Sequence, residues 1–131
     1  MTTPVSNITH GIKVSIVTEY LQDESIPEEN YYLFAYHITI DNNSDDTVQL
    51  LTRHWDIFDS AYEHRQVDGE GVVGEQPIIK PGKHFEYEST CALRSEIGKM
   101  KGYYILERSS DNKEFKVILP EFELISPQRL N

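Results

Sequence analysis

The stretch YYLFAYHITI, residues 31–40, consists almost entirely of aromatic and β-branched side chains. Such side chains favour a strand, because they pack well on a pleated and half-buried surface. The next segment, DNNSDD at residues 41–46, is rich in turn-forming residues and ends the predicted strand near Asp41. Strand-forming residues return in VQLLTRHWDIF, residues 48–58, which we expect to form a hairpin with the first strand.

Apolar and polar side chains alternate in several segments, as they do in a strand that buries one face. Two further segments of this kind are KVSIVTEY at residues 13–20 and HFEYESTCAL at residues 84–93. One face carries Val14, Ile16, Thr18 and Tyr20 in the first, Phe85, Tyr87, Ser89 and Cys91 in the second, and Gln49, Leu51, Arg53, Trp55 and Ile57 in the strand at 48–58. We expect Trp55 to anchor the core.

Shorter strands are predicted at residues 78–79, 103–108, 114–119 and 122–125, and the acidic segment 21–30 is predicted to be a surface loop. Pro81-Gly82 suits the central positions of a type II turn, and Asn112 suits the left-handed conformation of a tight hairpin. Many short strands without a helical period predict an all-β fold, an antiparallel β-sandwich of the immunoglobulin-like class. Without the paired cysteines of antibody domains, the fibronectin type III-like form is favoured.

Size and charge restrict the function. The 131 residues suit one domain spanning 1–131. We expect any flexible part of this domain to lie within residues 1–11. A net charge of −10 disfavours nucleic acid and anionic membrane as partners. No secretory signal or membrane-spanning stretch is recognisable. Cys91 is the single cysteine, which is typical of a reducing compartment, so we expect a cytoplasmic protein with this thiol buried in a strand.

The segment GEGVVGEQP, residues 69–77, contains the Gly-x-Gly-x-x-Gly pattern of dinucleotide-binding loops. That chemistry needs a helix after the third glycine, yet Pro77 and β-branched residues follow Gly74. Asp68, Glu70 and Glu75 also place carboxylates where a pyrophosphate would lie. We therefore interpret the glycines as structural, in a loop anchored by Val72 and Val73, and keep nucleotide or pyrophosphate binding as the alternative.

Catalytic and metal-binding patterns are weak. The five histidines have no zinc-site spacing, and neither a nucleophile elbow nor a second cysteine is present. His54 and Asp56 share one strand face, and Asp68, Glu70 and Glu75 offer hard oxygen ligands for Mg²⁺, but neither set matches a known site. The sequence therefore predicts no enzyme activity, no cofactor and no metal site.

Several motifs together resemble one family. GEGVVGEQP is followed by KPGKHFEYES, and the further matches are QLLTRHWDI at 49–57, GKMKGYY at 98–104 and FKVILPEFEL at 115–124. The combination resembles the ApaG family of small bacterial proteins, whose domain is also similar to part of some eukaryotic F-box proteins. The resemblance implies a fibronectin type III-like sandwich, a role in protein interaction, and a link to magnesium and cobalt homeostasis.

The resulting hypothesis is a non-enzymatic cytoplasmic module that binds an unidentified protein. Arg53 and Trp55 are residue types enriched at the centre of binding surfaces, although Trp55 is expected in the core. The expected binding residues are Arg53, Gly69, Gly71, Val72, Gly74 and Gln76. The sequence predicts no particular oligomeric state.

Overall fold

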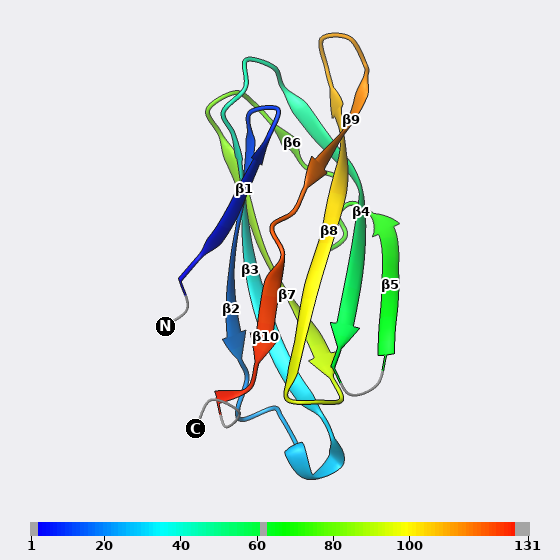
Figure 1. Ribbon diagram of the computed structural model, residues 1–131. Coiled ribbons are helices and arrows are strands. Elements are labelled where there is room, and N and C mark those ends of the chain that lie inside the picture. Colours follow the sequence, from blue (N-terminus) through cyan, green and yellow to red (C-terminus); the bar gives the residue numbers. More distant parts are fainter. Residues whose placement is uncertain (1–2, 61–62, 128–131) are drawn as a thin grey trace.

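The computed structural model, which describes residues 3–60 and 63–127, is an antiparallel β-sandwich (Figure 1). One sheet has the order β1-β2-β3-β7, formed by β1 (Val5–Thr9), β2 (Ile12–Tyr20), β3 (Tyr32–Asn42) and β7 (His84–Leu93). The other has the order β10-β8-β4-β5, formed by β10 (Phe122–Ile125), β8 (Ile97–Arg108), β4 (Val48–Asp59) and β5 (Glu63–Glu70). β6 (Ile78–Ile79) pairs with β4, and β9 (Glu114–Ile118) pairs with β8. The predicted fold class is confirmed.

Apolar side chains from both sheets fill the space between them. The predicted alternation of β2 is confirmed, since Val14 and Ile16 are buried, and that of β7 is confirmed by buried Tyr87 and Cys91. The hydroxyls of Tyr87 and Tyr104 form a buried hydrogen bond that joins β7 to β8 across the core. Other buried members include Phe34, Ile38, Ile40, Leu50, Leu93, Met100, Leu106, Val117 and Leu124.

The expected hairpin between residues 31–40 and 48–58 is wrong. β3 lies between β2 and β7, whereas β4 belongs to the other sheet between β8 and β5. Asn42, which is fully buried, fixes the connection: its Nδ2 donates to the carbonyl oxygens of Asp46 and Ile79, each at 2.8 Å. The turn-forming residues after Asp41 therefore carry the chain from one layer to the other.

The predicted face of β4 is also wrong in part. The register with β8 shifts between Leu50 and Thr52, which marks a β-bulge. Buried positions are Val48 and Leu50 before the bulge and Trp55 and Ile57 after it, so Gln49 does not share a face with Trp55. The prediction for Trp55 itself is confirmed, because only 2% of this residue is exposed.

Two strands had no sequence prediction. β1 lies within the segment 1–11 and pairs with residues 12–16 of β2. β5 pairs with β4 over residues 63–70 and carries mostly polar side chains. The predicted turn conformations are confirmed by positive φ angles of 78° at Gly82 and 56° at Asn112. Within residues 3–60 and 63–127, no helix is long and apolar enough to cross a membrane.

Candidate functional site

The glycine loop, residues 69–76, closes on itself at the end of β5. Val72 and Glu75 exchange backbone hydrogen bonds of 2.8 and 2.9 Å, and the amide of Gly71 donates to the Leu51 carbonyl at 2.8 Å. Gly71, Val73 and Gly74 have φ angles of 60°, 43° and 82°. Glycine adopts such angles without strain, so the structural interpretation of these glycines agrees with the backbone. The chain continues into β6 and not into a helix.

The two valines of the loop behave differently. Val72 is fully buried and anchors the loop in the core, as predicted. Val73 is 53% exposed, so the prediction that it is a second anchor is wrong. Its positive φ turns its side chain outward, which leaves an apolar group on the surface at the tip of the loop.

Gln76 ties the loop to β4. Its Nε2 donates to the Leu51 carbonyl oxygen at 2.9 Å, and Nε2 of Gln49 donates to the Gln76 carbonyl oxygen at 3.1 Å. The structure therefore brings Gln76 together with the bulged part of β4. Gly74 faces open space, because a Cβ at that position would meet nothing within 4 Å.

Arg53 lies half-buried against the same loop. Its Nη1 donates to the carbonyl oxygens of Glu70 at 3.1 Å and Gly71 at 2.9 Å. A Cβ at Gly69 would lie 2.7 Å from both Nη atoms, so the guanidinium covers this glycine. Among residues 3–60 and 63–127, no carboxylate lies within ion-pair distance of Arg53. The loop therefore holds the guanidinium through backbone carbonyl oxygens.

Next to Arg53, the outer face of the second sheet carries a histidine–aspartate cluster, made of His54, Asp56, His64 and Asp68. Nδ1 of His54 lies 2.6 Å from Oδ1 of Asp68, and its Nε2 lies 3.1 Å from Oδ2 of Asp56. Nε2 of His64 lies 2.9 Å from the other oxygen of Asp56. The cluster joins β4 to β5, so the structure brings His54 and Asp56 together with residues that sequence reasoning missed.

Hydrogen bonding sets the charges of this cluster. The hydrogen bond with Asp68 raises the pKa of His54 above the ordinary value of 6.5 for histidine, and Asp56 contributes in the same direction. Hydrogen bonds from His64 and Gln66, with a smaller contribution from His54, lower the pKa of Asp56 to about 2. Both ring nitrogens of His54 face carboxylates, so the protonated ring can donate to both, and this is why its pKa is raised.

An open hollow of about 600 Å³ joins the cluster to the glycine loop. Its walls include Arg53, His54, Gly69 and Tyr103. The His54 and Tyr103 rings stack with centroids 4.9 Å apart, and Nζ of Lys116 lies 4.1 Å from the Tyr103 centroid. Stacked rings beside a cation form an amphipathic surface that suits contact with another molecule.

The carboxylates considered for Mg²⁺ lie at the end of β5 and in the glycine loop. Asp68 is engaged by His54, while Glu75 lies in the closed part of the loop. In the part of the chain that the structure describes, no three His, Cys, Asp or Glu side chains are grouped so that they could hold a metal ion.

A second hollow, of about 250 Å³, opens between β5 and β7, the last strands of the two sheets. It is lined by Arg53, Trp55, Arg65, Tyr36, Ser89 and Cys91, among others. Nη2 of Arg65 donates to the Ala92 carbonyl oxygen at 2.7 Å and so bridges the sheets. Burial raises the pKa of the Cys91 thiol to about 11, although the charge of Arg65 acts in the opposite direction. Arg65 was not predicted as a site residue because β5 was not predicted as a strand.

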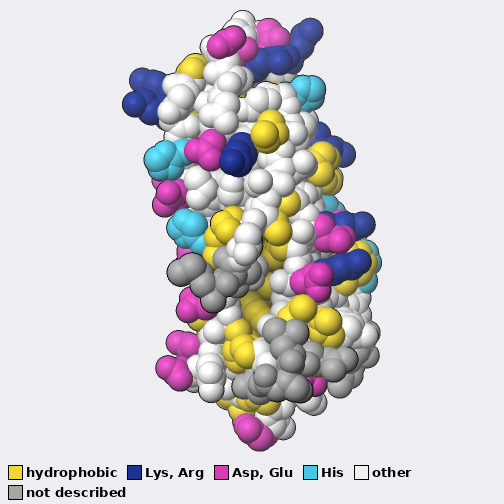
Figure 2. All heavy atoms as spheres, turned by 60° about the vertical axis from the view of Figure 1, so that its left-hand side comes forward, with side chains coloured by type: hydrophobic (Ala, Val, Ile, Leu, Met, Phe, Trp, Pro, Cys, Tyr) yellow, Lys and Arg dark blue, Asp and Glu magenta, His cyan; other side chains and the backbone are white. Residues whose placement is uncertain are grey.

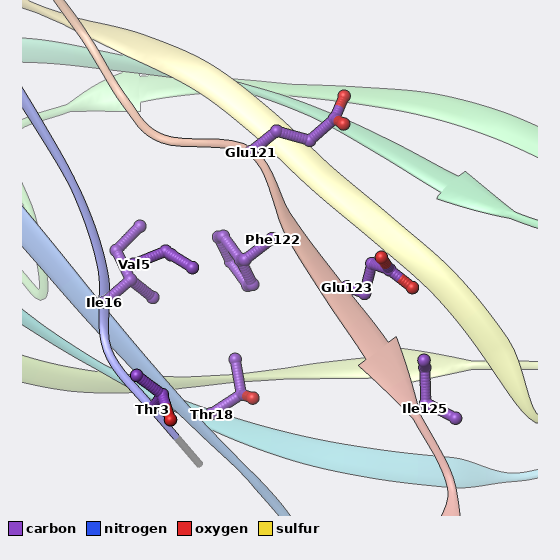
Figure 3. Close-up of a pocket in the computed structure, with 8 residues that line it drawn as sticks. All are labelled: Thr3, Val5, Ile16, Thr18, Glu121, Phe122, Glu123 and Ile125. Carbon is purple, nitrogen blue, oxygen red and sulfur yellow. The ribbon is translucent and has the colours of Figure 1, made fainter. Parts of the chain in front are cut away.

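On the opposite side of the sandwich, an apolar groove of about 400 Å³ separates β2 from β10. In Figure 2, which brings this side forward, hydrophobic side chains run down its middle. Figure 3 shows Val5, Ile16 and Phe122 gathered between the strands, with Glu121 and Glu123 extending over β8. None of the sequence-predicted binding residues lies in this groove.

Comparison with known proteins supports the family resemblance drawn from the motifs. Residues 22–108 match the family model described as the ApaG domain. Protein ApaG of Brucella anthropi is 45% identical over 122 residues, which cover 93% of each chain, and protein ApaG of Brucella canis is 42% identical over 124 residues, 95% of each.

The fold is shared with a solved structure. The crystal structure of a Bordetella pertussis protein described as ApaA superposes with a TM-score of 0.85 at 38% sequence identity, covering 89% of this chain and 94% of that one. A family match over more than half of the chain, close relatives of equal length and a common fold together confirm the resemblance drawn from the motifs. The chain therefore belongs to the ApaG family.

Proposed function

We propose that this chain is a non-enzymatic, cytoplasmic binding module that recognises a protein partner through the glycine loop and the adjoining part of β4. The observation that carries the proposal is that one loop holds Arg53, through the carbonyl oxygens of Glu70 and Gly71, and exposes the apolar side chain of Val73. Arginine is enriched at the centre of protein interfaces, and the buried core of an interface is more apolar than its rim.

The reactive groups nearest the site favour binding over catalysis. Each ring nitrogen of His54 is engaged by a carboxylate, so neither is free to take a proton from a substrate. The Cys91 thiol is buried, with a pKa of about 11, and it is therefore protonated and unreactive at neutral pH.

Nucleotide or pyrophosphate binding by the loop is the rival hypothesis. A phosphate-binding loop presents free backbone amides to the ligand. Here the amides of Gly71, Val72 and Glu75 already donate to carbonyl oxygens of the protein. Calorimetry with ATP, diadenosine tetraphosphate and pyrophosphate tests the rival. A dissociation constant below about 10 μM, roughly −7 kcal/mol, would favour it over our proposal.

The family resemblance implies a link to magnesium and cobalt. This link is compatible with the proposal if the partner, and not this chain, binds the ions. The carboxylate of Asp68 is already engaged by His54 and is poorly placed to ligate a cation. Adding millimolar Mg²⁺ or Co²⁺ should therefore leave the melting temperature unchanged, whereas a bound ion would raise it by mass action.

The proposal is tested by affinity capture with matched surface variants. Gly71 and Val72 are buried and unsuitable for substitution, because a carboxylate there would unfold the loop. Val73→Asp keeps the fold, because Val73 is exposed and aspartate tolerates a positive φ. Ile8→Asp, at an apolar position on β1 that is also more than half exposed, is the control. We expect one partner to be lost by Val73→Asp and retained by Ile8→Asp; equal retention by both contradicts the proposal.

A further inference from the structure

We propose that the cleft between β5 and β7 binds a carboxylate side chain, presented by an extended acidic segment of the partner protein. The inference rests on the proposed function for the existence of a protein partner. It adds the chemistry that this partner presents and a second arginine, Arg65, which was not among the predicted binding residues.

The charge of the cleft suits a carboxylate. The chain has 22 acidic and 12 basic residues, yet the described residues that line the cleft include two arginines and no carboxylate. Among the described residues, the hydrogen-bond acceptors of Arg53 are the carbonyl oxygens of Glu70 and Gly71. The nearest acid to Arg65 is Glu63, whose oxygen is 3.9 Å away and whose side chain is 46% exposed. An exposed pair at that distance is weak, so both guanidiniums keep donors for an incoming carboxylate.

The side chains that line the cleft also suit a carboxylate. Trp55 and Tyr36 form a buried floor, and their rings pack edge to face with centroids 5.7 Å apart. The half-buried Ser89 adds a hydroxyl, and Val67 lies at the mouth, 36% exposed. A rigid aromatic floor that excludes water strengthens an ion pair above it. The volume of about 250 Å³ suits one acidic side chain and is below the size of typical small-molecule sites.

The strand edges beside the cleft can receive an extended peptide. Within residues 3–60 and 63–127, β7 is paired only with β3 and β5 only with β4, so each presents one unpaired edge. An exposed strand edge can receive an extended peptide, whose main chain provides affinity while alternate side chains enter pockets. Arg65 crosses to the Ala92 carbonyl oxygen and closes the cleft at that point. A peptide along the free edge of β5 or β7 would direct one side chain into the cleft, toward Arg65.

A carboxylate is favoured over a phosphate by the charge of the rest of the chain. At −10, the protein repels a dianionic phosphate about twice as strongly as a singly charged carboxylate. The planar fork of arginine matches the geometry of a carboxylate with two parallel hydrogen bonds.

The test is selection from a random peptide display library on the full chain. The selected peptide is then synthesised with its acidic residue, with the corresponding amide, and with phosphoserine at that position. Binding is measured to the wild type, to Arg65→Gln and to Arg108→Gln. Arg108 pairs with Asp111 in a surface turn, so its variant makes the same change of charge away from the cleft. Thermal melting verifies that both variants fold.

We expect the selected peptides to share one acidic position. Its change to the amide, and Arg65→Gln, should each weaken binding about tenfold or more, while Arg108→Gln changes it less than about twofold. The inference is overturned if binding survives the amide or Arg65→Gln, or if phosphoserine binds more tightly than the carboxylate. Failure to select any peptide also counts against it. Peptides that need Val73 but no acidic residue would overturn the carboxylate site and leave the proposed function standing.

Discussion

The guanidinium of Arg53 occupies the space that a side chain at Gly69 would fill. The two residues are direct partners in the pairing of β4 with β5, and a Cβ at position 69 would lie 2.7 Å from both Nη atoms. The first glycine of the motif therefore makes room for an arginine, whose hydrogen bonds then fix the carbonyls of Glu70 and Gly71. This relationship explains a glycine at position 69, where φ is not positive.

Gly69→Ala should displace Arg53 without unfolding the protein, because the clashing atoms are the end of a flexible side chain. The loss of two hydrogen bonds predicts a fall of about 1–2 kcal/mol in the free energy of unfolding. Urea unfolding, followed by the fluorescence of the buried Trp55, measures it. In an Arg53→Ala background, the same glycine substitution should cost much less. Additive effects of the two changes would show that the residues do not depend on each other.

Gly71→Ala should destabilise the protein far more than Gly74→Ala. Both glycines have positive φ, which costs an alanine about 1–2 kcal/mol. At Gly71 the added Cβ would also lie 2.0 Å from the Glu75 carbonyl oxygen, while at Gly74 it would meet open space. Thermal unfolding without ligand compares the two variants. Melting temperatures of both within a degree of the wild type would refute the structural role of the loop glycines.

The pKa of His54, measured by NMR titration, should lie above 6.5 and fall in Asp68→Asn. Asp56→Asn should lower it less, because Asp68 is the larger cause. A raised pKa in the folded state means that protonated His54 stabilises the fold below pH 6.5. This contribution is lost as the pH rises through the raised value. It should be small, since 70% of the Asp68 side chain is exposed and water screens the pair. A larger effect of Asp56→Asn would contradict this order.

Asn42→Asp should be severely destabilising, by about 3 kcal/mol or more, because a buried charge replaces a satisfied amide. The amide nitrogen of Asn42 donates to two carbonyl oxygens, which a carboxylate would repel. Denaturant unfolding measures the loss. The neighbouring exposed residue provides the control, and Asn43→Asp should change stability by less than about 0.5 kcal/mol. Similar losses for both would show that Asn42 does not join the two sheets.

Strands with regular alternation were predictable because their pattern reflects burial of one face. β2 and β7 follow this rule, and the β-rich composition of β3 identified it as well. β5 was missed because EHRQVDGE has almost no apolar side chain, since the strand is exposed at the end of its sheet. The predicted pairing of β3 with β4 was wrong because composition does not encode which sheet a strand joins. That choice involves long-range contacts, such as the hydrogen bond from the buried amide of Asn42 to the Ile79 carbonyl oxygen.

The candidate site was predictable only in part, for the same reason. The glycine pattern indicated Gly71 and the buried Val72, and the face of Trp55 suggested Arg53. Arg65 and His64 could not be included, because their positions depend on the pairing of β5 with β4. Val73 was assigned to the core by its side-chain type, whereas its positive φ turns it to solvent.

Site-specific photo-crosslinking tests the central claim most directly, because it reports which surface touches a partner. Benzoylphenylalanine replaces Val73 in one variant and Ile8 in another, two exposed apolar positions on different parts of the molecule. Both proteins are irradiated in cells of the native host. The account predicts a discrete protein adduct from position 73, lost when Gly69→Ala is added, and no such adduct from position 8. An adduct from position 8 alone, or equal adducts from both, would contradict the claim that the glycine loop is the binding surface.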